Sequence, residues 1–293
     1  MKVLVTGTSG QLGYDVMNEL KKRGHHGVGA DRSGTDATFE HVILDITDQN
    51  LVEKTLAEVR PDAVIHCAAW TNVDAAEAPE NLEKVRAVNV DGTRNLAKAC
   101  KNIGAKMLYI STDYVFNGEG VTPWQPDDKN YAPINVYGQS KLDGELAVAE
   151  TLEDYFIVRI AWVFGLNGKN FVETMLKLSE THDELRVVND QIGTPTYTVD
   201  LSRLLVDMIE TEKYGYYHAT NEGGYISWAD FAAEIMNQAG KTMRIIPVST
   251  AEYGASVARR PFNSRLDKNK LVENGFTPLP TWQDALRRYL QSC

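Results

Sequence analysis

Cysteine is scarce in this 293-residue sequence, and the three that occur, Cys67, Cys100 and Cys293, show no CxxC spacing. Neither a disulfide framework nor a zinc site is therefore indicated. The chain also lacks any run approaching the roughly 20 apolar residues of a membrane span. It enters a strand-like segment directly after Met1, without a charged leader and an apolar signal core. We expect a cytoplasmic protein that does not associate with membranes.

Positive charge is also in short supply. Lys and Arg total 30 against 40 Asp and Glu, which gives a formal net charge of −10 at pH 7. A surface of this sign repels nucleic acid and anionic lipid, so we expect neither as a partner. An anionic substrate is compatible with this charge only if the binding site itself is locally positive. The hydrophobic content of 43% is ordinary for a globular protein with a large core.

An apolar run at residues 2–6 leads into a glycine-rich loop and then into a helical pattern of Leu12, Val16 and Leu20. This strand, loop and helix order is typical of dinucleotide binding, because glycines let the backbone approach a pyrophosphate and the helix N-terminus supplies amide donors. The loop residues that we predict to bind the cofactor are Gly7, Thr8, Gly10, Gln11, Leu12 and Gly13. Their GxxGxxG spacing differs from the usual GxGxxG fingerprint. It resembles the loop of the extended short-chain dehydrogenase/reductase superfamily.

Acidic residues follow the next two expected strands. Asp31, after the strand at 26–30, can accept hydrogen bonds from an adenosine ribose, which favours NADH. Arg32 can instead pair with a 2′-phosphate, so the sequence leaves NADPH and NADH both open. Asp45 and Ile46 end a strand that begins at His41 and can flank the adenine, although a helix cap or a turn is an equal role for Asp45.

Small residues end the buried strand that begins at Asp62. Ala68 and Ala69, with Thr71 beyond them, would let a cofactor lie close at the crevice of a parallel sheet. A long helical region is expected from about residue 73 to residue 102. Within it, Asn89 can bridge backbone groups near the cofactor, or it can be an ordinary solvated helix residue.

The residues Tyr137 and Lys141 are four positions apart, which places them on one face of a helix. An ammonium beside a phenol stabilises the phenolate, so we expect Lys141 to lower the pKa of Tyr137 from about 10 toward the working pH. Such a tyrosine can give a proton to a carbonyl oxygen or take one from an alcohol. Thr112 follows the buried strand at 106–110, where its hydroxyl can hydrogen-bond a substrate carbonyl. We predict these three residues to be catalytic.

Several further blocks give the whole chain a more specific resemblance. They lie at 68–77, 111–116, 162–165, 168–171, 191–196 and 260–264. Together these blocks resemble the dTDP-4-dehydrorhamnose reductases. The resemblance implies an α/β protein with a doubly wound parallel Rossmann sheet at 1–160. It also implies a smaller α/β sugar-nucleotide domain, mainly at 161–293, with chain exchange between the two.

The resemblance implies that NADPH or NADH reduces the C4 keto group of dTDP-6-deoxy-L-lyxo-4-hexulose to give dTDP-L-rhamnose. Tyr137 would donate the proton, Thr112 would orient the carbonyl, and Lys141 would also hold the nicotinamide ribose. The sugar pocket would be shaped by Thr71, Val73, Asp113, Tyr114 and Trp162. One member of the resembled family is a magnesium-bound dimer. Because a full set of acidic ligands has no match here, we predict no metal and carry a homodimer over only as an expectation.

Three residues in the last third of the chain have both a binding and a structural interpretation. Trp162 can stack on a pyranose or a base, or it can pack in the core. Asn170 opens a helix and is either a substrate contact or the helix cap. Arg260 belongs to the one local basic cluster and can clamp the diphosphate of a nucleotide-sugar, with a solvated surface position as the alternative.

Two other functions fit parts of the pattern. A nucleotide-sugar epimerase or dehydratase would share the cofactor motifs, but a dehydratase needs an acid and a base beside the tyrosine. Asp113 can be the acid, whereas Tyr114 occupies the place of the expected glutamate base. A non-catalytic, NADP-binding regulatory subunit would also keep the fold. The intact Thr112, Tyr137 and Lys141 argue against that role.

Overall fold

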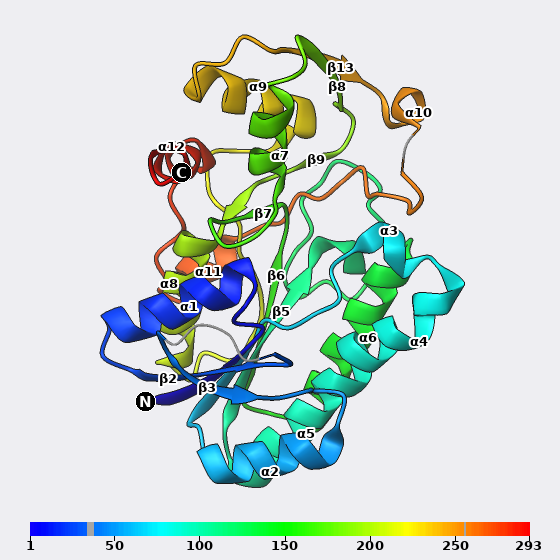
Figure 1. Cartoon of the computed structure of the whole chain (residues 1–293). Helices are drawn as coiled ribbons and strands as arrows, with labels where there is room; N and C mark the ends of the chain where they lie inside the picture. The colour runs from blue at the N-terminus through cyan, green and yellow to red at the C-terminus, as the bar shows by residue number, and fades with distance from the viewer. Residues whose placement is uncertain (34–37, 255) are drawn as a thin grey trace.

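The computed structural model describes residues 1–33, 38–254 and 256–293. Its largest element is a seven-stranded sheet in which all neighbouring strands are parallel (Figure 1). In spatial order the strands are β11 (Gly215–His218), β6 (Tyr155–Ile160), β5 (Lys106–Thr112), β4 (Ala63–His66), β1 (Lys2–Thr6), β2 (His26–Asp31) and β3 (Glu40–Ile43). The predicted Rossmann-type parallel sheet is confirmed.

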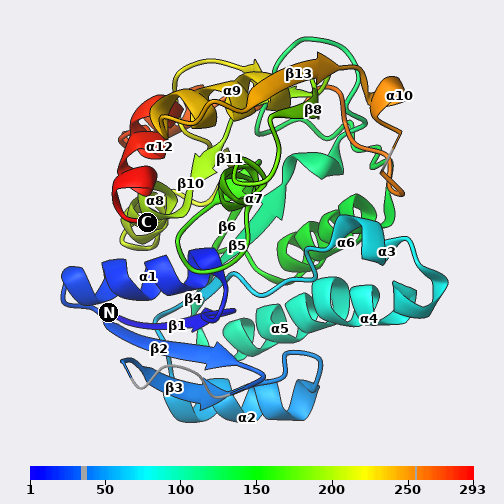
Figure 2. The same cartoon turned by 45° about the horizontal axis from the view of Figure 1, so that its top comes forward.

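Helices cover both faces of this sheet (Figures 1 and 2). One face packs against α1 (Gln11–Lys22), α8 (Thr198–Ile209) and α11 (Asn269–Glu273). The other packs against α2 (Gln49–Val59), α5 (Thr93–Ile103) and α6 (Val136–Thr151). Strands buried on both faces need apolar side chains at successive positions, which is why their sequences are continuous hydrophobic runs.

The order of the strands predicts where the ligand-binding crevice of the sheet lies. Strand β1 pairs with β2 on one side and with β4 on the other. The chain connections therefore diverge between β1 and β4, and in such sheets ligands bind at this point, outside the carboxyl ends of the strands. The glycine loop leaves β1 there, residues 67–72 leave β4, and Thr112 ends β5 at the same edge.

Residues after β6 form a second apolar cluster and also return to the large sheet through α8 and β11. Figure 1 shows α7, α9, β8 and β13 gathered at the top of the molecule, away from α2 and β3. The elements of this part are β7 (Val163–Phe164), α7 (Phe171–Leu178), β8 (Glu184–Val188), β9 (Ile192–Gly193), β10 (Thr196–Tyr197), β12 (Ile226–Ser227), α9 (Trp228–Gln238), β13 (Arg244–Val248), α10 (Thr250–Tyr253) and α12 (Trp282–Gln291). The domain boundary at residue 160 stays a prediction.

The long helical region expected at 73–102 is largely helical, but it is divided into α3 (Val73–Ala76), a 3₁₀ turn (Pro79–Asn81), α4 (Leu82–Arg86), a π-helix (Ala87–Gly92) and α5. Pro79 cannot donate a backbone hydrogen bond, so the first helix ends before it. In the C-terminal third, β8 and β13 pair in parallel. Among the described residues, no helix has the length and apolar character needed to cross a membrane.

Helix α9 begins with a reciprocal cap that its sequence predicts. The Ser227 hydroxyl accepts a hydrogen bond from the Asp230 amide at 3.0 Å, and the Asp230 carboxylate accepts one from the Ser227 amide at 2.9 Å. Both interactions satisfy backbone or side-chain groups that would otherwise be unpaired at the helix start.

We expect Ser227→Ala to lower the free energy of unfolding by about 1 kcal/mol, because the Asp230 amide loses its side-chain acceptor. Chemical denaturation measures this loss. The matched control is Ser249→Ala, which removes the same capping box from the four-residue α10. A loss in the control as large as that in Ser227→Ala would contradict the argument that burial of the cap sets its value.

Candidate active site

A large cavity of about 990 Å³ lies at the carboxyl edge of the sheet. Its volume falls in the range of small-molecule and cofactor sites. Most of the predicted site residues line it: Gly7, Gly10, Gln11, Leu12, Gly13, Asp31, Arg32, Asp45, Ile46, Ala68, Ala69, Thr71, Val73, Thr112, Asp113, Tyr114, Tyr137, Lys141 and Trp162. Four predicted residues, Thr8, Asn89, Asn170 and Arg260, do not belong to its lining.

The glycine loop at one end of the cavity is shaped for close approach. Gly7 has a φ of +73°, and a Cβ there would lie 2.7 Å from the Ala68 nitrogen. A Cβ on Gly13 would lie 2.3 Å from the Gly7 carbonyl oxygen. Helix α1 starts after Gly10 with no side-chain cap and no acidic residue in its first turn. Its free amides and positive dipole end therefore face the cavity, which fits a diphosphate.

Asp31 lines the cavity, but its carboxylate is already used to shape the loop. Its Oδ2 accepts hydrogen bonds from the Ser9 amide at 3.0 Å and the Ser9 hydroxyl at 2.5 Å. Its Oδ1 accepts from the Arg32 amide at 3.0 Å. Ser9 also lines the cavity and was not predicted, although it lies within the glycine loop. The structure thus places Asp31 and Arg32 side by side at the cavity wall, as the sequence suggested.

Asn89 does not line the cavity but forms hydrogen bonds with Trp70, which does. Its Oδ1 accepts a hydrogen bond from the Trp70 amide at 2.8 Å, and its Nδ2 donates to the Trp70 carbonyl at 3.2 Å and the Ser140 hydroxyl at 2.9 Å. The side chain lies in the π-helix and is 1% exposed. It bridges backbone groups as expected, and through Ser140 it joins the segment after β4 to helix α6. It does not itself face a ligand.

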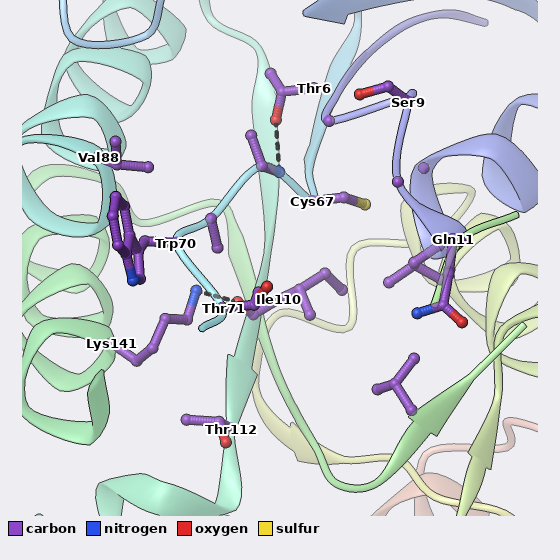
Figure 3. Close-up of a pocket in the computed structure, with 18 of the residues that line it drawn as sticks. Thr6, Ser9, Gln11, Cys67, Trp70, Thr71, Val88, Ile110, Thr112 and Lys141 are labelled. Atoms are coloured by element: carbon purple, nitrogen blue, oxygen red, sulfur yellow. Dashed lines mark hydrogen bonds between the residues drawn. The ribbon is translucent and has the colours of Figure 1, made fainter. Parts of the chain in front are cut away.

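Two of the catalytic candidates, Thr112 and Lys141, lie near the end of β5 (Figure 3), and Tyr137 lines the same cavity. Asn135 caps α6 by accepting a hydrogen bond from the Gly138 amide at 2.7 Å, and this cap fixes the turn that carries Tyr137. Burial raises the pKa of the Tyr137 phenol, while a hydrogen bond with Thr112 acts in the opposite direction. The expectation that Lys141 lowers this pKa is wrong for the protein without a bound cofactor, in which the pKa of Tyr137 is raised. Removal from water disfavours the phenolate by more than the neighbouring groups favour it.

The Lys141 side chain contacts strand β5. Its ammonium donates a hydrogen bond to the Ile110 carbonyl at 2.7 Å and lies 4.1 Å from the centre of the Tyr109 ring (Figure 3). Burial lowers the pKa of Lys141 to about 7, against the attraction of Glu145. The amine therefore changes charge near neutral pH, where an unperturbed lysine would be fully protonated.

Two residues that follow β5 extend the site. The Thr112 hydroxyl donates a hydrogen bond to Asp113 Oδ1 at 3.0 Å, and burial raises the pKa of Asp113 to about 6. The Tyr114 ring packs edge-on against Tyr137, with ring centres 5.7 Å apart. Burial also raises the pKa of Tyr114, so both phenols are neutral at pH 7.

Trp162 packs against another aromatic ring at the cavity wall, and its stacking on a pyranose or a base stays a prediction. It lines the cavity, and its ring stacks on Trp228 with centres 3.8 Å apart and planes at 17°. Its φ of 51° is unusual for a bulky residue. Trp228 also lines the cavity. Nothing local in the sequence predicts this, because Trp228 reaches the site through tertiary packing, including its stacking on Trp162.

Asn170 and Arg260 form structural contacts instead of lining the cavity. Asn170 caps α7 by accepting from the Glu173 amide at 3.0 Å, and its Nδ2 donates to the Gly165 carbonyl and to Gln11. Arg260 donates to both carboxylate oxygens of Asp74 on α3, at 3.1 and 2.8 Å. The cap for Asn170 is confirmed. Arg260 is neither a free solvated side chain nor, in this structure, open to a ligand.

The charge of the cavity differs from that of the whole chain. Its lining contains four basic residues, Arg32, Lys84, Lys141 and Lys169, and three acidic ones, Asp31, Asp45 and Asp113. The formal balance is thus 4 − 3 = +1, against −10 for the chain. Lys84 and Lys169 were not predicted as site residues; Lys169 lies in the block at 168–171, whereas no motif marks Lys84. A locally positive site in an acidic protein is what an anionic ligand requires.

The comparisons with known proteins agree with this geometry. A family model described as the RmlD substrate binding domain matches residues 1–293. A dTDP-4-dehydrorhamnose reductase of Streptomyces griseus is 41% identical over 289 residues, which cover 97% of this chain and 91% of that protein. The chain belongs to the dTDP-4-dehydrorhamnose reductase family.

Other relatives of this reductase family span nearly the whole chain as well. The spore coat polysaccharide biosynthesis protein SpsK of Bacillus subtilis is 41% identical over 290 residues, which cover 99% of this chain and 97% of that protein. The crystal structure of the Bacillus anthracis reductase in complex with NADP is 40% identical, with a TM-score of 0.92 and coverage of 100% and 99%. Within the residues described, no cluster of three or more His, Cys, Asp or Glu is arranged to hold a metal ion.

We expect Gly13→Ala to reduce the affinity for NADPH about tenfold or more, equivalent to at least ~1.4 kcal/mol. The new methyl group would collide with the Gly7 carbonyl and force the loop out of shape. Quenching of protein fluorescence by NADPH measures the affinity. Gly10→Ala is the matched control for loop geometry. A Cβ at this position would lie 3.3 Å from the Gly7 carbonyl oxygen, so a small shift would accommodate it. Equal thermal destabilisation in both variants would contradict the steric argument.

Proposed function

We propose that this protein is an NADPH- or NADH-dependent reductase of the C4 keto group of dTDP-6-deoxy-L-lyxo-4-hexulose, with dTDP-L-rhamnose as product. The observation that carries the proposal is the neutral Tyr137 phenol beside Thr112, in the same cavity as a glycine loop shaped for a diphosphate. Membership of a family whose relatives are named dTDP-4-dehydrorhamnose reductase supports this substrate.

The cofactor end of the cavity fits a nicotinamide dinucleotide. When bound, that cofactor supplies the hydride. The amides at the start of α1 hold its diphosphate. Asp31 and Arg32 lie where side chains contact the adenosine ribose in folds of this type. Arg32 gives a 2′-phosphate a cationic partner, while Asp31 suits a free ribose hydroxyl, so both cofactors have a basis in the site. The role of Lys141 is to hold the nicotinamide ribose with its ammonium.

The raised pKa of Tyr137 suits the direction of the reaction. Reduction of a ketone leaves negative charge on its oxygen, and a neutral phenol can donate the proton that neutralises it. The Thr112 hydroxyl, which contacts both Asp113 and the phenol, orients the carbonyl toward Tyr137. A positive charge brought in by the oxidised cofactor would then favour the phenolate that remains.

The other end of the cavity is assigned to the sugar nucleotide. Thr71, Val73, Asp113 and Tyr114 form its polar and apolar walls, and the stacked Trp162 and Trp228 provide a flat face for a pyranose or a base. Arg260 is assigned to the diphosphate of the substrate, which would replace Asp74 as its partner. A cytoplasmic location and a homodimer remain predictions.

The test is NADPH or NADH consumption with the dTDP-4-keto-6-deoxy-L-sugar, generated in situ by an epimerase. We expect Tyr137→Phe to lower kcat by about 10²-fold or more, because the general acid is removed while the ring remains. Tyr114→Phe is the matched control, since it removes a phenolic hydroxyl from the adjacent ring without removing the acid. We expect it to retain most of kcat.

Absence of consumption by the unmodified protein with either cofactor, despite NADPH binding, would reject the reductase and favour a regulatory subunit. Formation of a dehydrated or epimerised sugar without net cofactor consumption would favour the epimerase or dehydratase. A loss in Tyr114→Phe equal to that in Tyr137→Phe would contradict the assignment of the acid.

A further inference from the structure

An ion pair lies fully buried between α6 and β6. Arg159 on β6 and Glu145 on α6 are both 0% exposed. The guanidinium binds the carboxylate through two hydrogen bonds of 2.8 Å, from Nε to Oε1 and from Nη2 to Oε2. Its remaining donors face the Pro126 carbonyl at 3.1 Å, the Tyr131 hydroxyl at 3.1 Å and His218 Nε2 at 3.4 Å. Every charge in this pair therefore has a partner.

A third group completes the arrangement. The Ser111 hydroxyl donates to Glu145 Oε1 at 2.5 Å. Ser111 precedes Thr112 on β5, and it lines the cavity. One carboxylate on α6 is thus held by side chains from two adjacent strands of the sheet, β5 and β6.

The position of Glu145 on α6 relates it to the catalytic residues. It lies four residues after Lys141 and eight after Tyr137, so the three side chains follow one another along one face of the helix. A rotation or slide of α6 against β5 would move Tyr137 away from Thr112. The contacts of Glu145 with Ser111 and Arg159 oppose such a movement.

Stability alone does not account for a pair of this kind. The cost of removing two charges from water offsets much of their attraction, and apolar residues of similar volume are often as stable or more stable. A bidentate pair that is fully enclosed beside the active site therefore calls for a role in geometry or charge.

The surroundings of Lys141 supply that role. The groups that face its ammonium are Tyr109 and the Ile110 carbonyl from β5, His66 and Cys67 from β4 and its end, and Glu145 from its own helix. Burial lowers the pKa of His66 to about 3 and raises that of Cys67 to about 12, so both are neutral at pH 7. Burial also keeps Tyr109 neutral. Within this set of described neighbours, Glu145 carries the only full negative charge.

We propose that Glu145 is a positioning residue, whose carboxylate, held by Arg159 and Ser111, fixes α6 against β5 and keeps the Lys141 ammonium charged in its buried site. The inference rests on the proposed function for the role of Lys141 in holding the nicotinamide ribose. It predicts an effect on cofactor binding that is measured without any sugar substrate.

The experiment measures NADPH affinity by fluorescence from pH 5 to pH 10, which covers both sides of the Lys141 pKa of about 7. Lys141→Met identifies the part of the alkaline loss that belongs to Lys141, because that part is absent in this variant. In Glu145→Gln the nearby negative charge is gone, so Lys141 loses its proton at lower pH. We expect the alkaline loss of affinity to begin about one pH unit lower than in the unmodified protein.

Glu145→Gln leaves Arg159 buried without an anion and can destabilise the fold, so a second variant is needed. The double substitution Glu145→Met with Arg159→Met removes both charges together and replaces them with side chains of similar volume. We expect the same shift to lower pH, since Glu145 is the member of the pair that raises the pKa of Lys141. Ser111→Ala retains both charges, so its NADPH affinity should fall at the same pH as in the unmodified protein. We expect its kcat to fall about tenfold, because α6 and Tyr137 are then misplaced against β5.

Asp200→Asn is the matched control. It breaks another bidentate pair, in which Arg288 binds Asp200 at 2.8 and 2.7 Å, at residues that do not line the cavity. We expect it to lower the melting temperature without changing the pH at which NADPH affinity is lost. The proposal is overturned if both Glu145 variants lose affinity equally at all pH values, or if Asp200→Asn shifts this pH as they do. Failure of NADPH consumption by the unmodified protein would instead reject the proposed function, and the binding profile would still decide the role of Glu145.

Discussion

The contact between helix α6 and strand β5 is the constraint on which the site depends. Tyr137 and Lys141 are carried by the helix, whereas Thr112 and the Ile110 carbonyl belong to the strand. Neither element alone contains a site, because proton transfer needs the phenol and the hydroxyl within hydrogen-bond distance. The parallel sheet fixes where β5 ends, and the packing of α6 on its face fixes where the phenol lies. The rest of the fold supports this one alignment.

Burial at this contact has opposite consequences for the two ionisable catalytic groups. It raises the pKa of Tyr137 and lowers that of Lys141, since in both cases the charged form loses hydration. A neutral phenol is what a ketone reduction needs at its start, but a neutral amine would lose its attraction for ribose hydroxyls. A negative charge four residues from the lysine and eight residues, or about two helical turns, from the tyrosine separates these two requirements. Glu145 occupies that position.

Much of the fold and cofactor site is encoded locally, and the sequence therefore predicts it. Glycines at Gly7 and Gly13 are required by the backbone itself, so their spacing identifies the loop before its partners are known. The alternation of buried runs and helices likewise predicts the parallel sheet. Groups that reach the cavity only through tertiary packing carry no such signal. Trp228 lines the cavity from a helix more than sixty residues after Trp162, and Lys84 belongs to an interrupted helical region that was predicted as continuous. The direction of the pKa shift of Tyr137 was missed for the same reason, because burial is not visible in a four-residue motif.

Arg260 illustrates why residue type alone does not identify a ligand contact. A guanidinium suits a diphosphate, but it suits a carboxylate equally well, and here it binds Asp74. The Asp74 side chain is 43% exposed, so this pair belongs to the class whose attraction is weakened by water and is worth roughly 0–1 kcal/mol. A diphosphate, with more negative charge and more acceptors, can therefore compete for the same guanidinium at little cost. In the absence of that ligand, the pair holds the segment at 256–262 against α3, whose first residue, Val73, lines the cavity. The same arginine thus connects the substrate end of the cavity to the C-terminal part of the chain.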